Sequence, residues 1–193
     1  MKPSAFARNS LALAGWEYEG PVPTEKKFVM LATPHTSNWD GLLLVFLTRS
    51  VGLDIQWMVK DQWVKGPIGP LVRGVGGVGI DRSRPQNLVE QMVEQFKVRD
   101  RFILAIPPEG TRSLTQYWKS GFYYIARGAE VPVVPGYLDY ARRRAGLGPA
   151  RMMTGDVTAD MDGLRAFYAE KDPRGSDHSK FGPIRLKDED AAK

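Results

Sequence analysis

The sequence contains no cysteine and only two histidines, His35 and His178. The absence of cysteine excludes disulfide bonds, thiolate metal sites and a cysteine nucleophile, and it is typical of a reducing compartment. A zinc site would need carboxylate ligands, and no ligand cluster is visible in the sequence. His178 lies in a polar tail and no surrounding pattern supports a chemical role for it.

The chain also lacks a long apolar run. The longest one, residues 42–47, is far shorter than the roughly 20 residues that a membrane-spanning helix needs. Residues 1–16 mix basic and apolar side chains without a sustained apolar stretch, which makes them a poor signal peptide. We therefore expect a cytoplasmic protein with no transmembrane segment, whose contact with a membrane is peripheral.

The 193 residues fit one domain, with a core at about residues 27–170 and a polar C-terminal tail at residues 172–193. The net charge of +5 favours anionic partners such as lipid surfaces, phosphorylated substrates or nucleic acid. Nothing in the sequence resembles a nucleic-acid-binding motif, so we expect no nucleic acid partner. The basic residues 142–144 are typical of a solvated turn, and contact with a phosphate-rich membrane or with nucleic acid is the alternative.

Strand and helix patterns alternate along the chain. Strands are expected at residues 27–33, 54–60, 101–107 and 131–140, and helices at residues 39–51, 85–100, 114–128 and 158–171. Residues 61–72 are broken by Gly and Pro, which predicts at most a short helix and a turn. The alternation predicts an α/β fold with a largely parallel or mixed central sheet and helices on both faces. Prolines at residues 131–140 predict a strand near a sheet edge or a strand start.

His35 directly follows the first predicted strand, and Asp40 stands in the first turn of the next helix. A loop histidine can act as a general base near neutral pH if a carboxylate orients it and stabilises its charged form. Acidic residues are also favoured at helix starts for electrostatic reasons, so the pair alone leaves a purely structural role open. Because no G-x-S-x-G elbow is present, the pair predicts activation of a substrate hydroxyl group without a serine nucleophile.

The glycine-rich residues 74–79 satisfy G-x-G-x-x-G by letter. No helix is expected to begin within them and no suitable acid follows, which argues against a dinucleotide site. A closely approached or flexible backbone is the better interpretation. Arg82 and Arg84 then stand just ahead of a predicted helix, where they are well placed to hold a phosphate.

The turn "PEGTRS", residues 108–113, follows a predicted strand and carries Glu109, Thr111 and Arg112. Free backbone N–H groups and a guanidinium would together suit a phosphomonoester, whereas the alternative is a capping turn with a solvated arginine. Glu109 and His35 both follow strands of the predicted sheet. We expect them on one sheet edge, because sites in open α/β sheets gather at the carboxyl ends of the strands.

Four blocks follow one another in the order "HTSNWD", "GGVGIDR", "PEGTRS" and "VPVVPGYLDY". The first has the form H-x-x-x-x-D (HX4D). Together they resemble the glycerophospholipid acyltransferase family, which includes the 1-acylglycerol-3-phosphate acyltransferases. The resemblance implies a glycerolipid acyltransferase-like fold. It also implies transfer of a fatty acyl group from acyl-CoA or acyl carrier protein to a lysophospholipid, most simply 1-acylglycerol-3-phosphate, in phospholipid synthesis.

The resemblance also implies roles for individual residues. His35 would take the proton from the acceptor hydroxyl, and Asp40 would orient His35. Substrate binding would fall to Arg82 in the second block and to Glu109, Gly110, Thr111 and Arg112 in the third, which is associated with the acceptor's phosphate. Residues 131–135 of the fourth block would bind the acyl donor or support the sheet beneath the site. No metal and no cofactor beyond the acyl donor is implied.

Many family members have hydrophobic N-terminal helices, whereas residues 1–34 here are weakly apolar. Contact with an anionic membrane surface would then rely on a small amphipathic helix around Phe6, Leu11, Leu13 and Trp16. This departure leaves another hydroxylated lipid acceptor open. A hydrolase with water as acceptor and a non-enzymatic protein that binds anionic lipid are the remaining alternatives.

Overall fold

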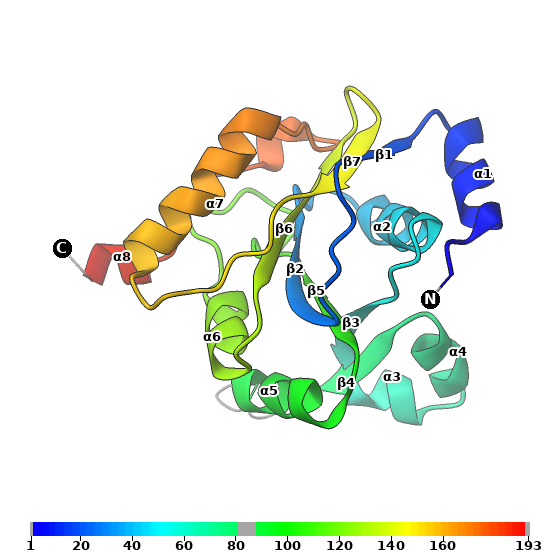
Figure 1. The fold of residues 1–193 in the computed structure, drawn as a ribbon, viewed down its shortest axis with the longest axis horizontal. Coiled ribbons are helices and arrows are strands. Elements are labelled where there is room, and N and C mark those ends of the chain that lie inside the picture. Colours follow the sequence, from blue (N-terminus) through cyan, green and yellow to red (C-terminus); the bar gives the residue numbers. More distant parts are fainter. Residues whose placement is uncertain (1, 81–87, 192–193) are drawn as a thin grey trace.

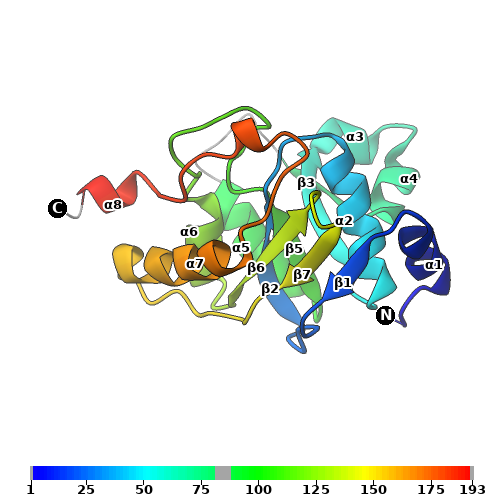
Figure 2. The ribbon, with the colours of Figure 1, turned by 90° about the horizontal axis from the view of Figure 1, so that it is seen from above.

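The computed structural model describes residues 2–80 and 88–191. Its centre is a sheet with helices on both faces (Figures 1 and 2). The strands are β1 (Glu17–Glu19), β2 (Lys27–Thr33), β3 (Ile55–Lys60), β4 (Gly77–Ile80), β5 (Phe102–Ile106), β6 (Val133–Asp139) and β7 (Arg144–Leu147). The helices are α1 (Ala5–Leu13), α2 (Trp39–Ser50), α3 (Asp61–Lys65), α4 (Gly69–Gly74), α5 (Leu88–Val98), α6 (Gly121–Gly128), α7 (Val157–Lys171), the 3-10 helix η2 (His178–Lys180) and α8 (Asp188–Ala191).

The seven strands lie in the order β1-β7-β6-β2-β5-β3-β4. All neighbouring strands are parallel except β6 and β7, which are antiparallel. The predicted mixed, largely parallel α/β sheet is therefore confirmed. The carboxyl ends of β2 and β5, which are paired neighbours, lie at one edge of the sheet.

Both faces of β2 are buried, and its alternating side chains enter two different cores. Val29 and Leu31 pack into the core that α5, α6 and α7 cover, whereas Phe28 and Met30 pack into the core on the α2 side. A strand that is covered on both faces has apolar residues at consecutive positions, and residues 28–32 are all apolar. This burial fixes the strand that leads into His35.

Two strand predictions need correction. β6 lies inside the sheet between β2 and β7, so of the two alternatives the sheet edge is wrong, whereas Pro132 does lie just before the start of the strand. Pro135 is tolerated because it lies opposite Gly148, which is one residue beyond the end of β7. The N–H of Gly148 donates to the Pro135 carbonyl at 2.7 Å. The missing proline N–H therefore costs no bond within the β6–β7 ladder. The other correction is β1, a short strand that the sequence pattern did not predict.

The glycine-rich residues 74–79 contain a strand, β4, that the sequence analysis missed. They also bring the backbone close to its neighbours, as expected. A Cβ atom on Gly76, whose φ is +100°, would lie 2.3 Å from the carbonyl oxygen of Ile55. A Cβ atom on Gly77 would lie 2.4 Å from a side-chain carbon of Val72. Glycine is required here because no side chain fits. Residues 61–72 form parts of two short helices, α3 and α4, where one was expected.

The helix predicted at residues 114–128 begins only at Gly121. The backbone before it bonds elsewhere: Trp118 N–H donates to the Arg185 carbonyl at 2.8 Å, and Lys119 N–H donates to the Pro108 carbonyl at 2.7 Å. These contacts tie the segment to the C-terminal tail and to the turn after β5. Tertiary hydrogen bonds thus override the local helical pattern.

The C-terminal tail lies along the protein surface (Figure 2). Leu186 in the tail is fully buried and bridges to Trp118. The predicted amphipathic N-terminal helix corresponds to α1, whose Leu11 is buried while Phe6 and Leu13 are exposed. No helix within the described residues has the length and apolar character needed to cross a bilayer.

Candidate active site

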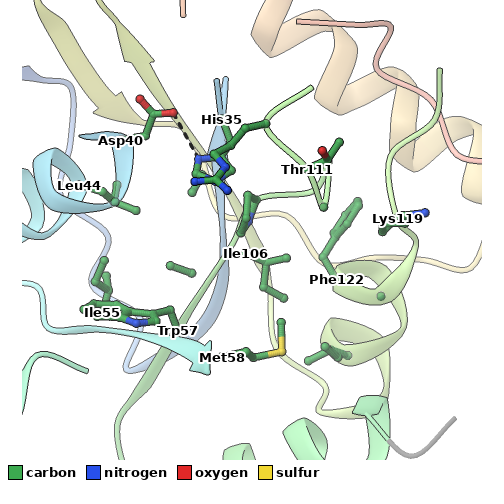
Figure 3. Close-up of a pocket in the computed structure, with 18 of the residues that line it drawn as sticks. His35, Asp40, Leu44, Ile55, Trp57, Met58, Ile106, Thr111, Lys119 and Phe122 are labelled. Atoms are coloured by element: carbon green, nitrogen blue, oxygen red, sulfur yellow. Dashed lines mark ion pairs between the residues drawn. The ribbon is translucent and has the colours of Figure 1, made fainter. Parts of the chain in front are cut away.

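His35 lies in the short loop between β2 and α2, at the carboxyl end of the central strand. Its Nδ1 atom is 3.3 Å from Oδ2 of Asp40, which stands in the first turn of α2 (Figure 3). The structure therefore brings the two predicted catalytic residues together. Nδ1 faces the carboxylate, which leaves Nε2 as the nitrogen available to a substrate.

The Asp40 carboxylate is only 4% exposed, yet it is well supplied with donors. Oδ2 accepts from the backbone N–H groups of Thr36 at 2.7 Å and Ser37 at 2.8 Å, and Oδ1 accepts from the Tyr140 hydroxyl at 2.6 Å. Burial alone would raise the pKa of Asp40, but the hydrogen bonds from His35, Tyr140 and the backbone outweigh it and lower the pKa below its ordinary value of 3.8. Asp40 is thus an anion at neutral pH and can stabilise a protonated imidazole.

Glu109 meets His35 as expected, since β2 and β5 are parallel neighbours and both residues follow their carboxyl ends. Glu109 Oε1 accepts the backbone N–H of His35 at 3.1 Å and the hydroxyl of Thr33. Glu109 is only 2% exposed, and Oε2 has no hydrogen-bond partner among the described residues. Burial is the largest influence on this carboxyl and raises its pKa.

Glu109 does not lie where its predicted role in substrate binding would place it. The carboxyl lies beneath the His35 loop and is not part of the cavity wall described below. Its contacts are those of a group that fixes the loop. A direct contact with substrate remains an untested prediction.

A cavity of about 1130 Å³ opens beside the histidine. His35 and Thr111 lie along its upper side in Figure 3, and Ile55, Trp57 and Met58 lie along its lower side. Its further apolar lining comes from α2, β5 and α6 and includes Leu44, Ile106, Phe122 and Ile125. The cavity thus has a polar entrance beside the His–Asp pair and an apolar interior between the sheet and the helices.

The turn after β5 forms part of the polar side of this cavity. Gly110, Thr111 and Arg112 all line it, and their role in substrate binding stays a prediction. Gly110 adopts a φ of +65°, and a Cβ atom there would lie 2.9 Å from Cγ of Lys119. Glycine therefore lets Lys119 lie over the turn.

Lys119 is a cavity-lining cation that the sequence analysis missed. It was assigned to the predicted helix at residues 114–128, where a lone lysine is unremarkable. The structure instead folds residues 114–120 back onto the turn. The only sequence signal was its position shortly after "PEGTRS".

Other predicted site residues lie elsewhere. Arg82 and Arg84 fall outside the described residues. Residues 131–135 do not line the cavity, and Val133 pairs with Val29 of β2, which favours the supporting role over donor binding. Among residues 2–80 and 88–191, no group of three or more potential metal ligands is present.

Comparisons with known proteins agree with this architecture. The family model described as Acyltransferase matches residues 16–139, more than half of the chain. No curated protein sequence matches the chain. The crystal structure of the 1-acyl-sn-glycerophosphate acyltransferase PlsC from Thermotoga maritima is similar in fold, with a TM-score of 0.58 and 20% sequence identity over 86% of this chain and 73% of that one. The chain therefore belongs to the acyltransferase family and is an O-acyltransferase, which confirms the resemblance to glycerophospholipid acyltransferases that its motifs carry.

Proposed function

We propose that this acyltransferase moves a fatty acyl group from acyl-CoA or acyl carrier protein to the hydroxyl of a lysophospholipid, most simply 1-acylglycerol-3-phosphate. One observation carries the proposal: the His35–Asp40 pair and the cationic turn around Arg112 lie on one cavity whose interior is apolar. A substrate with a phosphate, a hydroxyl group and a fatty chain matches those three features.

In the proposed step, the acceptor hydroxyl attacks the thioester carbonyl carbon while Nε2 of His35 takes its proton. A new C–O ester bond forms and the C–S bond breaks. The thiol then leaves with the proton that the imidazolium returns. Asp40 stabilises the imidazolium through Nδ1, 3.3 Å away. A positioned base contributes about 10²- to 10⁴-fold in rate, and the remainder must come from orientation and from stabilising the oxyanion. The step needs no metal ion.

The acceptor's phosphate is proposed to bind at the turn after β5. Arg112 and Lys119 supply positive charge, and Thr111 supplies a hydroxyl donor. Arg112 is exposed and forms no ion pair with the described residues, which suits a residue that meets a mobile anion. Arginine matches a phosphate with two parallel N–H donors, whereas lysine acts as a point charge.

The fatty chain is proposed to occupy the apolar interior of the cavity. Its volume of about 1130 Å³ slightly exceeds the roughly 300–1,000 Å³ of most ligand pockets, as expected for a site that holds a long chain. Phe122, Ile106 and Met58 would contact the methylene groups. Burying each methylene group contributes about 0.8 kcal/mol, so chain binding would supply much of the affinity.

We further propose that α2 carries the enzyme onto the cytoplasmic face of an anionic membrane. Trp39, Leu42, Leu43 and Phe46 follow helical spacing on one side of α2, and Trp39 and Leu42 are 69% and 50% exposed. Phe6 of α1 packs against Phe46 and extends this apolar surface. Because α2 begins next to the His35 loop, docking on this face would bring the site to its lipid substrate.

The test is the release of free thiol from acyl-CoA or acyl carrier protein with a panel of lysophospholipid acceptors, with products identified by mass spectrometry. We expect an acylated acceptor with the wild type and with His178→Ala, a control at the other histidine, and a loss of about 10²-fold or more with His35→Ala. Equal activity of His35→Ala and the wild type would refute the mechanism. Free fatty acid without an acylated acceptor would identify a hydrolase, and salt-sensitive lipid binding without turnover would identify a binding protein.

A further inference from the structure

Among the described residues, Tyr140 supplies the one hydrogen bond to Oδ1 of Asp40. Oδ2 is shared by His35 and the backbone of Thr36 and Ser37, whereas Oδ1 accepts, within the described part of the chain, only from the Tyr140 hydroxyl at 2.6 Å. A carboxylate held at a single oxygen can still rotate about its Cβ–Cγ bond. Holding both oxygens fixes its plane, and with it the direction in which Oδ2 faces His35.

Tyr140 directly follows β6 and is held by two segments that are distant from it in the sequence. Its ring meets the ring of Trp16 edge-on at 5.1 Å, and its backbone N–H donates to the Arg174 carbonyl at 2.8 Å. These contacts fix both the backbone and the ring of Tyr140. The hydroxyl of Tyr140 is therefore held in a fixed position next to Asp40.

The C-terminal segment that holds Tyr140 also holds the loop of the histidine. Ser176 Oγ lies 3.0 Å from Oγ1 of Thr36, and a Cβ atom on Gly175 would lie 2.8 Å from the same Thr36 oxygen. Residues 174–177 thus contact both Tyr140 and Thr36, each of which donates a hydrogen bond to Asp40. The tail that the sequence describes only as polar completes the support of the site.

We propose that Tyr140 is a positioning residue of the acyl-transfer site, whose hydroxyl orients Asp40 and through it His35. The inference rests on the proposed function and deepens it. Burial and the neighbouring negative charge of Asp40 raise the pKa of Tyr140 above its ordinary value of 10.0, so the hydroxyl stays protonated and remains a donor at neutral pH. A tyrosine that served only as core packing would have no need of this hydroxyl.

Removing the hydroxyl changes how Asp40 faces His35. In the described residues, His35 contacts the titratable groups Asp40 at Nδ1 and Glu109 at the backbone N–H, Arg112 and Lys119 line the same cavity, and Tyr140 acts through Asp40. Without the donor on Oδ1, the carboxylate can rotate about its Cβ–Cγ bond, and Oδ2 is no longer held toward Nδ1. Asp40 then stabilises a protonated imidazole less well in the transition state.

The experiment compares Tyr140→Phe with the wild type by imidazole NMR spectra of the protein without substrate. The phenylalanine ring keeps the contact with Trp16. We expect the imidazole resonances of His35 to shift while those of His178, the internal control, stay in place. We also expect kcat for acyl transfer to fall roughly 10-fold with little change in KM, as for the loss of one hydrogen bond to a charged group.

Tyr124→Phe is the matched control variant, since the Tyr124 hydroxyl donates to Asp188 at 2.6 Å on the exposed surface, away from the cavity. It should change neither readout. If Tyr140→Phe gives the wild-type His35 resonances and rate, the inference is wrong. If Tyr140→Phe is unfolded, Trp16→Phe decides instead: it keeps the hydroxyl but weakens its support, and it should shift the His35 resonances and lower kcat by a smaller amount. Unchanged resonances and kcat in Trp16→Phe would then refute the inference. Absence of acyl transfer by the wild type would refute the proposed function, whereas the NMR comparison tests the link from Tyr140 to His35 independently.

Discussion

Asp40→Asn separates the charge of this residue from its shape. The variant keeps the size of the side chain but removes the negative charge 3.3 Å from Nδ1 of His35. It also turns one oxygen into an N–H₂ group. That group would face either the N–H donors of Thr36 and Ser37 or the hydroxyl of Tyr140, all of which now donate to the carboxylate.

The size of the effect follows from the distance between the charges. Two unit charges 3.3 Å apart attract by about 5 kcal/mol at an effective dielectric constant of about 20. Asp40 is 4% exposed, so water screens this attraction little. If the imidazolium forms fully in the transition state, losing the attraction slows the reaction by about 10³- to 10⁴-fold, since each 1.36 kcal/mol is a factor of ten. This lies at the upper end of the contribution of a positioned base.

The assay is acyl transfer at saturating donor and varied acceptor, with kcat and KM measured separately for purified, folded protein. We expect the loss in kcat and little change in KM, because Asp40 acts on the transition state. Asp162→Asn, which breaks a surface ion pair with Arg165, is the control and should leave both constants unchanged. A loss below about tenfold in folded Asp40→Asn, or a loss confined to KM, would refute the reasoning.

Three further predictions follow from the site and its surroundings. Burial raises the pKa of Glu109 above its ordinary value of 4.5, so the folded protein binds the carboxyl proton more tightly than the unfolded chain does. The free energy of unfolding of the wild type should therefore fall as the pH rises from about 4.5 through the raised pKa. Glu109→Gln has no such proton and should not show this loss of stability. Thermal unfolding at several pH values checks this, and parallel curves for the two proteins would contradict it. Arg112→Ala should raise KM for a phosphorylated acceptor roughly 10- to 100-fold in steady-state kinetics, with no such change for the exposed control Lys97→Ala. The double variant Trp39→Ser/Leu42→Ser should no longer sediment with anionic vesicles yet should still turn over short-chain substrates; unchanged sedimentation would show that α2 is not the docking face.

Much of the fold could be predicted from local sequence patterns. The buried runs of β2 and β5 and the apolar face of α5 are strong local signals, and the structure has each of these elements where it was expected. The errors arose where distant contacts decide the backbone. Residues 114–120 have a helical composition but bond to residues 108 and 185, and β6 contains prolines but lies inside the sheet.

The candidate site was predictable to the extent that it depends on strand order. His35 and Glu109 follow two strands, and parallel neighbours bring their carboxyl ends to one edge of a sheet, so their meeting is a consequence of topology. The role of Glu109 was less visible. Its burial beneath the His35 loop depends on the path of the turn after β5, which no local pattern describes.

The sequence by itself determined the alternation of strands and helices, the His35–Asp40 spacing across one tight turn, and the family, because each depends on residues that are close along the chain. Only the tertiary structure decided that Lys119 reaches the cavity and that Tyr140 holds Asp40. It also decided that residues 174–177 support the His35 loop. The contacts of Tyr140 with Asp40 and of Ser176 with Thr36 join residues 100 and 140 positions apart, and chain packing alone brings such segments together. Lys119 reaches the cavity because its backbone N–H donates to the Pro108 carbonyl, a bond that the helical pattern around it does not predict.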